Sequence, residues 1–316
     1  SKFLRTDGDG TCSWQTVATG LSSDGQYNTV GGTNAGNSFS GTSATKNTLI
    51  GYDAGTAVTT GDENTCLGYL SGTVITTGST NICLGQEAGR QITTGSTNIA
   101  IGKSAMGTSS GITTGGENIA IGSNSLYALT NGYYNVAIGR QSAYDLTSGQ
   151  RNVVIGYDTA INLTTGNNNV VFGKDAAFNL TTGSDNFYVG ELAGRNNTTG
   201  SSNIGIGPYA LSGANGANTA GYNIGLGTYA LGLALTTGTQ NIALGDYAGQ
   251  QVTTGSNSTF IGRQSGNNVT SGQDNVFIGD YAGDNLTTGS NNTCIGHDAL
   301  PSSATVSNEI TLGSTN

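Results

Sequence analysis

The sequence predicts an all-β protein, a parallel β-solenoid in which a short stretch of chain forms one coil after another. Three observations predict this fold. A glycine recurs every 17 residues, an apolar-x-apolar segment precedes it, and a Thr-Thr-Gly turn follows it. Internal repeats of this length are typical of solenoids. With 53 glycines and only 9% charged residues among 316, the composition also differs from that of ordinary globular domains.

The repeat reads Asn-apolar-x-apolar-Gly, with a small residue three positions after the glycine and Thr-Thr-Gly further on. The spacing of 17 residues lengthens to 20 at Lys103–Gly122 and at Pro208–Gly227, and to 18 in the next coil. The segment Asn28–Gly36 is a degenerate further repeat. The sixteen repeat glycines are Gly51, Gly68, Gly85, Gly102, Gly122, Gly139, Gly156, Gly173, Gly190, Gly207, Gly227, Gly245, Gly262, Gly279, Gly296 and Gly313.

Each apolar-x-apolar segment, such as Ile99–Ile101, is expected to form a short strand, because it alternates and is rich in β-branched residues. A second short strand is expected at each apolar-Thr-Thr segment, such as Leu163–Thr165, with glycine at the corners. Stacked coils bring equal positions to about 4.8 Å from each other, so the asparagines, the Ile/Leu residues and the threonines should form ladders. About seventeen coils would make a rod ~80 Å long.

The two ends of the chain differ from the array. Residues 1–27 do not follow the repeat, and the segments KFLRT and TCSWQTV on either side of DGDG predict a hairpin. Residues 28–313 form the repeat array. The final residues, 314–316, are expected to lead into a C-terminal region beyond Asn316. Asp7 and Asp9 are interpreted as part of a polar turn, since the later ligands of a calcium loop are missing.

Charge and cysteine pattern narrow the function classes. The net charge is −9 and the ten basic residues form no cluster, so neither nucleic acid nor an anionic membrane is an expected partner. No apolar run is long enough for a membrane span, and no insertion into a membrane is expected. Cys66, Cys83 and Cys294 share one repeat position and are interpreted as small buried hydrophobes, with a disulfide left open as an alternative.

No catalytic residue, cofactor or metal site is expected. His297, the one histidine, lies at a coil corner without a nucleophile near it in the repeat. Carboxylates recur just after the repeat glycine and are interpreted as an exposed, solubilising edge rather than a glycosidase pair. A glycan-degrading enzyme and an ice-binding solenoid remain distant alternatives. These carboxylates are Asp53, Glu87, Asp158, Asp175, Glu191, Asp246, Asp280 and Asp298.

Tyrosines are the candidate contact residues for a cell-surface carbohydrate or protein receptor, because a tyrosine combines a flat apolar ring with a polar tip. Packing along the rod or between chains is the competing interpretation. The longer coil Pro208–Tyr222 is the expected contact patch, since solenoids often carry recognition on longer loops. The candidates are Tyr209, Tyr222, Tyr229, Tyr247 and Tyr281.

The middle residue of each apolar triplet is expected to face away from the bulky Ile/Leu column, and this column or the one beside it is expected to form a subunit seam. An apolar stripe along the whole rod would be larger than soluble monomers normally expose, so the sequence predicts a homo-oligomer. Replacing Ala120 and Ala137 with Asp is expected to break it. The seam candidates are Cys66, Cys83, Ala100, Ala120, Ala137, Val154 and Val171.

Two families carry similar repeats. The Asn-apolar-Ala-Ile-Gly strand resembles the head repeats of YadA-like trimeric autotransporter adhesins, which form a left-handed β-roll. The segments Phe3–Val17, the array from Asn47 to Gly296, and Val306–Gly313 more closely resemble bacteriophage tail fibres in which such arrays precede a self-cleaving intramolecular chaperone domain. This resemblance implies a homotrimeric extracellular fibre of a virion that attaches to a host cell. A bacterial surface adhesin is the alternative, and a membrane anchor rather than a chaperone domain after Asn316 would favour it.

Overall fold

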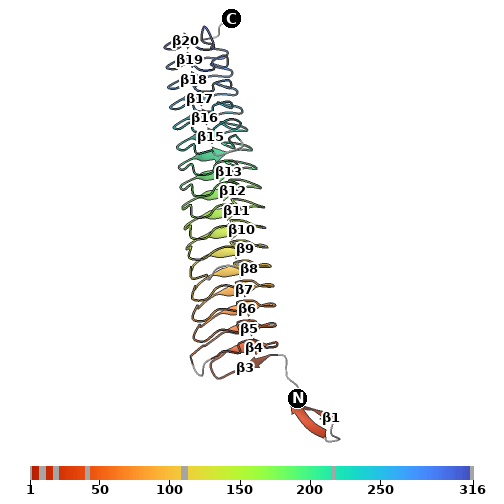
Figure 1. Ribbon diagram of the computed structural model, residues 1–316. Coiled ribbons are helices and arrows are strands. Elements are labelled where there is room, and N and C mark those ends of the chain that lie inside the picture. Colours follow the sequence, from red (N-terminus) through yellow and green to blue (C-terminus); the bar gives the residue numbers. More distant parts are fainter. Residues whose placement is uncertain are drawn as a thin grey trace.

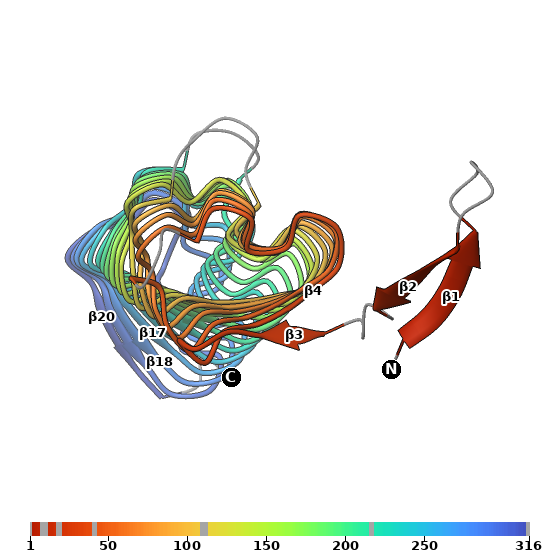
Figure 2. The same cartoon turned by 90° about the horizontal axis from the view of Figure 1, so that it is seen from below.

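The computed structural model describes residues 2–6, 12–16, 21–39, 43–107, 113–214 and 218–313. Within these residues the protein is a parallel β-solenoid of strands and turns, as the sequence predicts, and no helix occurs. The coils stack into a long rod with one strand per coil (Figure 1). Seen end on, the strands lie along one side of the coil, and the stack rotates gradually along its axis (Figure 2).

Eighteen strands, β3–β20, form one ladder. From β4 onward every strand pairs in parallel with the next, and equal repeat positions lie opposite each other, as in Val136↔Val153. The strands of the array are β4 (Thr29–Gly31), β5 (Thr48–Ile50), β6 (Thr65–Leu67), β7 (Ile82–Leu84), β8 (Ile99–Ile101), β9 (Ile119–Ile121), β10 (Val136–Ile138), β11 (Val153–Ile155), β12 (Val170–Phe172), β13 (Phe187–Val189), β14 (Ile204–Ile206), β15 (Ile224–Leu226), β16 (Ile242–Leu244), β17 (Thr259–Ile261), β18 (Val276–Ile278), β19 (Thr293–Ile295) and β20 (Ile310–Leu312).

The N-terminal segment contains the expected hairpin. Strands β1 (Lys2–Thr6) and β2 (Cys12–Thr16) pair antiparallel, while Asp7 and Asp9 lie outside the described residues. Strand β3 (Ser22–Ser23) pairs antiparallel with β4 and begins the ladder. The degenerate repeat at Asn28 is therefore a real coil, because β4 also pairs in parallel with β5.

The prediction of a second strand in each coil is wrong for the described residues. Apart from the three-residue strand, each coil consists of turns and bends, and the Thr-Thr-Gly side contains only the isolated bridges Ile92↔Thr113 and Asn197↔Asn218. The chain bends at the two threonines themselves, such as Thr164 and Thr165, so this segment is not extended into a strand. The coil also turns sharply elsewhere. Residues with left-handed backbone recur at fixed places, such as Arg151 (φ 56), Asp158 (φ 52) and Ala160 (φ 46). Hydrogen bonds between coils offset the cost of about 1 kcal/mol for each such residue.

The glycine that ends each strand is required by the closeness of the next coil. Gly156 has φ 143, and a Cβ there would lie 2.7 Å from the carbonyl oxygen of Gly173. A side chain at this position would therefore push neighbouring coils apart and break their hydrogen bonds, such as that from Gly156 N to the carbonyl of Ile138 (2.8 Å). This contact explains why the glycine recurs at every coil.

A buried asparagine ladder runs along the inside of the rod. Asn152 Nδ2 donates to Oδ1 of Asn135 (3.0 Å) and to the carbonyl of Gly166 (2.9 Å). Its own Oδ1 accepts from the backbone N–H and the Nδ2 of Asn169, both at 3.0 Å. The nitrogen and the oxygen of the amide are thus both hydrogen-bonded, within the coil and to the coils before and after it. These bonds satisfy a polar group that has no access to water.

The expected direction of the strand faces is wrong. The leading asparagine is buried, so alternation along the strand places the middle apolar residue on the same inner side and the bulky Ile/Leu residues outside. The middle residues therefore form the core of the single chain, and substituting Asp for Ala120 and Ala137 would disrupt folding rather than test a seam. The residues at most 1% exposed include all the seam candidates: Cys66, Cys83, Ala100, Ala120, Ala137, Val154 and Val171.

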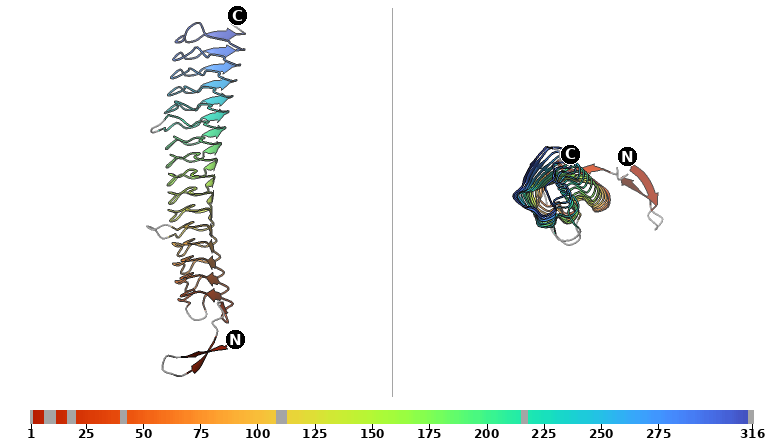
Figure 3. Two further views of the ribbon diagram at one scale, coloured as in Figure 1. Left: turned by 90° about the vertical axis from the view of Figure 1, so that its right-hand side faces the viewer. Right: turned by 90° about the horizontal axis from the view of Figure 1, so that it is seen from above.

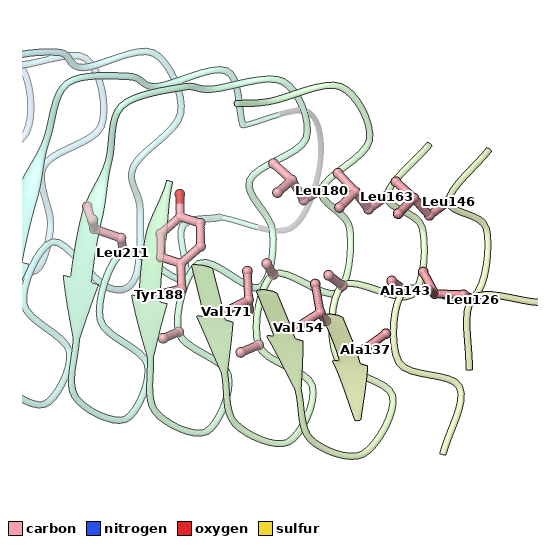
Figure 4. Packing of buried hydrophobic residues seen from close by; sticks show 14 of the residues in the cluster. Leu126, Ala137, Ala143, Leu146, Val154, Leu163, Val171, Leu180, Tyr188 and Leu211 are labelled. Carbon is pink, nitrogen blue, oxygen red and sulfur yellow. The ribbon is translucent and has the colours of Figure 1, made fainter. Parts of the chain in front are cut away.

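Side-chain volumes in the core are matched across each coil. The middle strand residue faces the residue six positions later, and in most coils one is large where the other is small. In two coils, those of Ala137 and Ala243, both positions are small. Ala120 lies in the coil of Leu126, Val154 in that of Ala160, and Tyr188 in that of Gly194. A Cβ on Gly194 would lie 2.6 Å from the Tyr188 ring. Figure 4 shows the side chains of Val154, Val171 and Tyr188 pointing from their strands into the coil. Such complementarity produces the dense packing of protein interiors.

Tyr188 requires a further exchange in the same coil. Its hydroxyl accepts a hydrogen bond from Asn197 Nδ2 (2.6 Å), at a place where other coils have Leu163 or Leu180. Burial raises the pKa of the Tyr188 phenol. The asparagine therefore satisfies a hydroxyl that an aliphatic side chain would leave unpaired.

Replacing Ser258 with Asn is expected to stabilise the rod. Ser258 is the one break in the asparagine ladder of residues 28–292, and its hydroxyl accepts from Asn275 N (3.2 Å) but offers no amide donors. Two restored hydrogen bonds should add about 1–2 kcal/mol and a few degrees to the thermal midpoint. Asn152→Ser is the matched reverse change and should lower the midpoint. An unchanged midpoint in both variants would show that the ladder contributes nothing.

Replacing Gly89 with Met is expected to destabilise the chain by about 2–4 kcal/mol. The methionine side chain would overlap Cys83, and the backbone at this position is left-handed. Adding Cys83→Ala copies the pairing of Ala100 with Met106 in the next coil and should recover most of the loss. Urea unfolding of the single and double variants measures the coupling. Additive losses would contradict the matching of volumes across the coil.

Candidate functional site

The outer face of the ladder is a continuous apolar surface. We call the first and third residues of strands β5–β19 the outer sheet face, and the strands line one side of the rod from end to end (Figure 3). The face is apolar at most places, with Thr48, Thr65, Thr259 and Thr293 among its first positions. Its large apolar side chains that are at least 36% exposed are Leu67, Ile82, Phe187, Ile204, Ile206, Ile242, Ile278 and Ile295.

The size of the outer sheet face is unusual for a surface in water. Two columns about 7 Å apart over fifteen strands spaced about 4.8 Å apart give a footprint on the order of 500 Å². This lies near the upper end of the apolar patches found on soluble monomers, and such patches often mark interaction sites. The exposed apolar stripe therefore lies on the columns beside the predicted one, and its role as a subunit seam stays a prediction.

Three of the five candidate tyrosines form a single stack. The rings of Tyr209 and Tyr229 lie 4.5 Å apart at 12°, and those of Tyr229 and Tyr247 lie 5.6 Å apart at 16°. Tyr281 lies apart from them, with the Arg263 guanidinium 4.7 Å from its ring centre. Tyr222 is 66% exposed and precedes the ladder residue Asn223, in a different column from the other four. The five tyrosines therefore do not form one patch.

A surface hollow of about 200 Å³ opens beside the tyrosine stack. Arg195 and Asn196 line it from one coil, Tyr209 from the next, and Tyr229 and Leu233 from the third. Sequence reasoning missed Arg195, Asn196 and Leu233. The sequence does contain a signal for this place. The small residues Ser212 and Gly213 stand where the preceding coil has Arg195 and Asn196. We call this place the corner hollow.

Both insertions are accommodated before the coil resumes its register. The bridges Ile92↔Thr113 and Asn197↔Asn218 join an ordinary coil to a longer one, so the extra residues lie before Thr113 and Asn218. Residues 108–112 and 215–217 themselves lie outside the described residues. A second, polar hollow of about 250 Å³ lies beside the first insertion and is lined by Thr114 and Glu117 among others. Irregular surface therefore accompanies the two long coils.

His297 and the carboxylates that follow the repeat glycine are half-buried or exposed. No three His, Cys, Asp or Glu side chains lie together in the described ranges in a way that could hold a metal ion. His297 is 63% exposed and lies 3.2 Å from the carboxylate of Asp298. Several carboxylates of the glycine-following column instead pair with cations of adjacent coils, as Asp280 does with Arg263 (3.0 Å).

The cysteines of the array are buried thiols, as predicted. Cys66, Cys83 and Cys294 are free, and they show no accessible surface. A hydrogen bond with Cys66 and burial hold the pKa of Cys83 well above its usual range. Burial raises the pKa of Cys294 to about 11. Cys83 and Cys294 are therefore protonated core side chains at neutral pH.

Alkaline pH is expected to weaken the fold through these thiols. In the unfolded chain the thiols lose their protons near about pH 8.5, whereas in the folded chain Cys83 and Cys294 keep theirs to higher pH. Their full contribution to the free energy of unfolding is therefore present below about pH 8.5 and is lost as the pH rises above it. The loss of thermal stability between pH 8 and 10.5 should be smaller in Cys83→Ala/Cys294→Ala than in the unaltered chain. Equal losses in the two proteins would contradict the raised pKa values.

Comparisons with protein-family models, curated proteins and solved structures found no match. In the part of the chain that the structure describes, no helix is long and apolar enough to cross a membrane.

Proposed function

We propose that this chain is the rod segment of a homo-oligomeric extracellular fibre that holds an attachment surface away from its base. The observation that supports the proposal is the outer sheet face, an apolar surface that follows the rod through successive coils. Parallel sheets are normally covered on both faces. In this chain the coil interior covers one face, and a partner is required for the other.

A second copy of the chain is the partner that best fits this surface. The outer sheet face is long, narrow and repeated with the period of the coils. Another copy has the same length, the same period and the same apolar columns, so ridges and gaps match along the whole rod. A footprint on the order of 500 Å², enlarged by the flanking residues, approaches the ~800 Å² per partner that stable interfaces bury.

The number of copies and the biological setting rest on the resemblance to trimeric fibres. A homotrimer, with three sheet faces turned toward a common axis, is the proposed assembly, and a virion tail fibre is the proposed setting. The stiffness of the rod supports this role, because hydrogen bonds along its axis connect every coil to the next. The proposal assigns no reaction to the chain.

Placing charge on the outer sheet face is expected to dissociate the assembly. Ile138 and Ile155 point outward and are half-buried, so replacing both with Lys leaves the coil core unchanged but puts like charges into the interface. Sedimentation velocity should show the mass falling from the oligomer to the 31.7 kDa chain.

The matched control places the same charges elsewhere on the rod. Thr165 and Thr182 are exposed on the Thr-Thr-Gly side, so Thr165→Lys/Thr182→Lys should sediment as the unaltered oligomer. If the isoleucine variant stays oligomeric with an unchanged circular dichroism spectrum, the outer sheet face is not the interface. If both variants dissociate, net charge rather than this face controls assembly.

A further inference from the structure

The corner hollow exists because two surface columns lose their side chains at the same place. One column carries Phe178 and Arg195 in successive coils and continues with Ser212 and Gly232. A Cβ on Gly232 would lie 2.6 Å from the carbonyl oxygen of Tyr209, so this position cannot be refilled without moving the backbone. The hollow is therefore part of the fold of these coils.

The neighbouring column ends at the same hollow. Asn162 Nδ2 donates to Asn179 Oδ1 (3.3 Å), Asn179 Nδ2 donates to Asn196 Oδ1 (3.1 Å), and Asn196 Nδ2 donates to the carbonyl of Gly213 (3.1 Å). Gly213 has no side chain with which to continue this second amide ladder. The amide of Asn196 is thus satisfied and rigid at one end of the hollow.

Among the residues that the structure describes, Arg195 forms no ion pair with a carboxylate. Its guanidinium lies 5.7 Å from the ring centre of Phe178, and its Nε is buried without a hydrogen-bond partner. The amide of Asn196 and the hydroxyl of Ser212 are engaged, since Ser212 Oγ donates to the carbonyl of Gly232. Glu191, a nearby carboxylate in sequence, pairs with Lys174 (3.6 Å). A guanidinium held in this way can bind a carboxylate by donating two parallel hydrogen bonds to its oxygens.

The tyrosine wall also favours an anion. Stacking occupies the facing surfaces of Tyr209 and Tyr229, so the sides of the stack present ring edges, which carry positive partial charge. The phenol of Tyr229 is neutral at physiological pH, as an ordinary tyrosine is, and can donate a hydrogen bond; burial and the neighbouring Tyr209 and Tyr247 raise its pKa further. Leu233, 44% exposed, supplies an apolar surface on the remaining side.

We propose that the corner hollow binds a sugar residue that carries a carboxylate, with the carboxylate on Arg195 and an apolar face of the sugar ring against Leu233. The volume of about 200 Å³ suits one monosaccharide rather than a long chain. The inference rests on the attachment role proposed above and names the chemistry of the attachment. One such hollow per chain would be repeated around the oligomer, so that weak single sites act together.

The test is a titration of the intact oligomer with sodium glucuronate, N-acetylneuraminate, glucose and acetate, followed by saturation-transfer NMR. At least one of the two acidic sugars should bind saturably, and glucose and acetate should bind at least ten-fold more weakly. Arg195→Gln should weaken acidic-sugar binding about ten-fold. Arg195→Lys, which keeps the charge but loses the planar fork, should give an intermediate loss.

The matched control is Arg151→Gln, since Arg151 is an exposed arginine in another column of the rod. This variant should bind acidic sugars like the unaltered chain. Equal binding of glucose, equal binding of acetate, or no effect of Arg195→Gln in a folded variant would each overturn the inference. Absence of sugar binding by a protein that still forms the oligomer would overturn this site alone, whereas a monomeric chain would contradict the proposed fibre.

Discussion

The buried asparagine ladder is the interaction on which the rest of the structure depends. Each amide joins two consecutive coils, and it also accepts the backbone N–H of the following asparagine. Since an unpaired amide in a dry core would cost several kcal/mol, the asparagines can lie inside only while the coils remain in register. Register, rather than an exact coil length, is thus the condition for satisfying these amides, because Asn118 Nδ2 also donates to Asn98 Oδ1 (3.1 Å) across a coil of 20 residues.

The same ladder determines which residues the rod exposes. An inward asparagine places the next strand residue outside, the middle residue inside and the third outside. The core then consists of small or volume-matched side chains, and the bulky isoleucines and leucines face outward. The sheet thus carries apolar side chains on its outer face although its inner face already packs on an apolar core. This outer apolar face is the physical reason to expect that other chains cover the sheet.

Much of the fold could be predicted from the repeat, and the errors have definite causes. Single positions of the repeat are enough to predict its period, the strands, the degenerate coil at Asn28 and the buried cysteines. The direction of the strand faces was wrong because both faces are apolar, and the sequence does not show that the asparagine is the inward residue. The prediction of a second strand was wrong because the chain bends at the two threonines, such as Thr164 and Thr165, and a propensity pattern does not show these bends.

The corner hollow was only partly predictable, since it arises from residues of three different coils. The long coil and its tyrosines indicated the region, but Arg195 has no repeat signature of its own.

The most direct test of the proposed oligomer is the mass of the unaltered chain, measured by native mass spectrometry at micromolar concentration. We predict a mass that is a multiple of 31.7 kDa, with three copies for the trimer. A folded chain of 31.7 kDa, with its outer sheet face in water, would contradict the proposed oligomer.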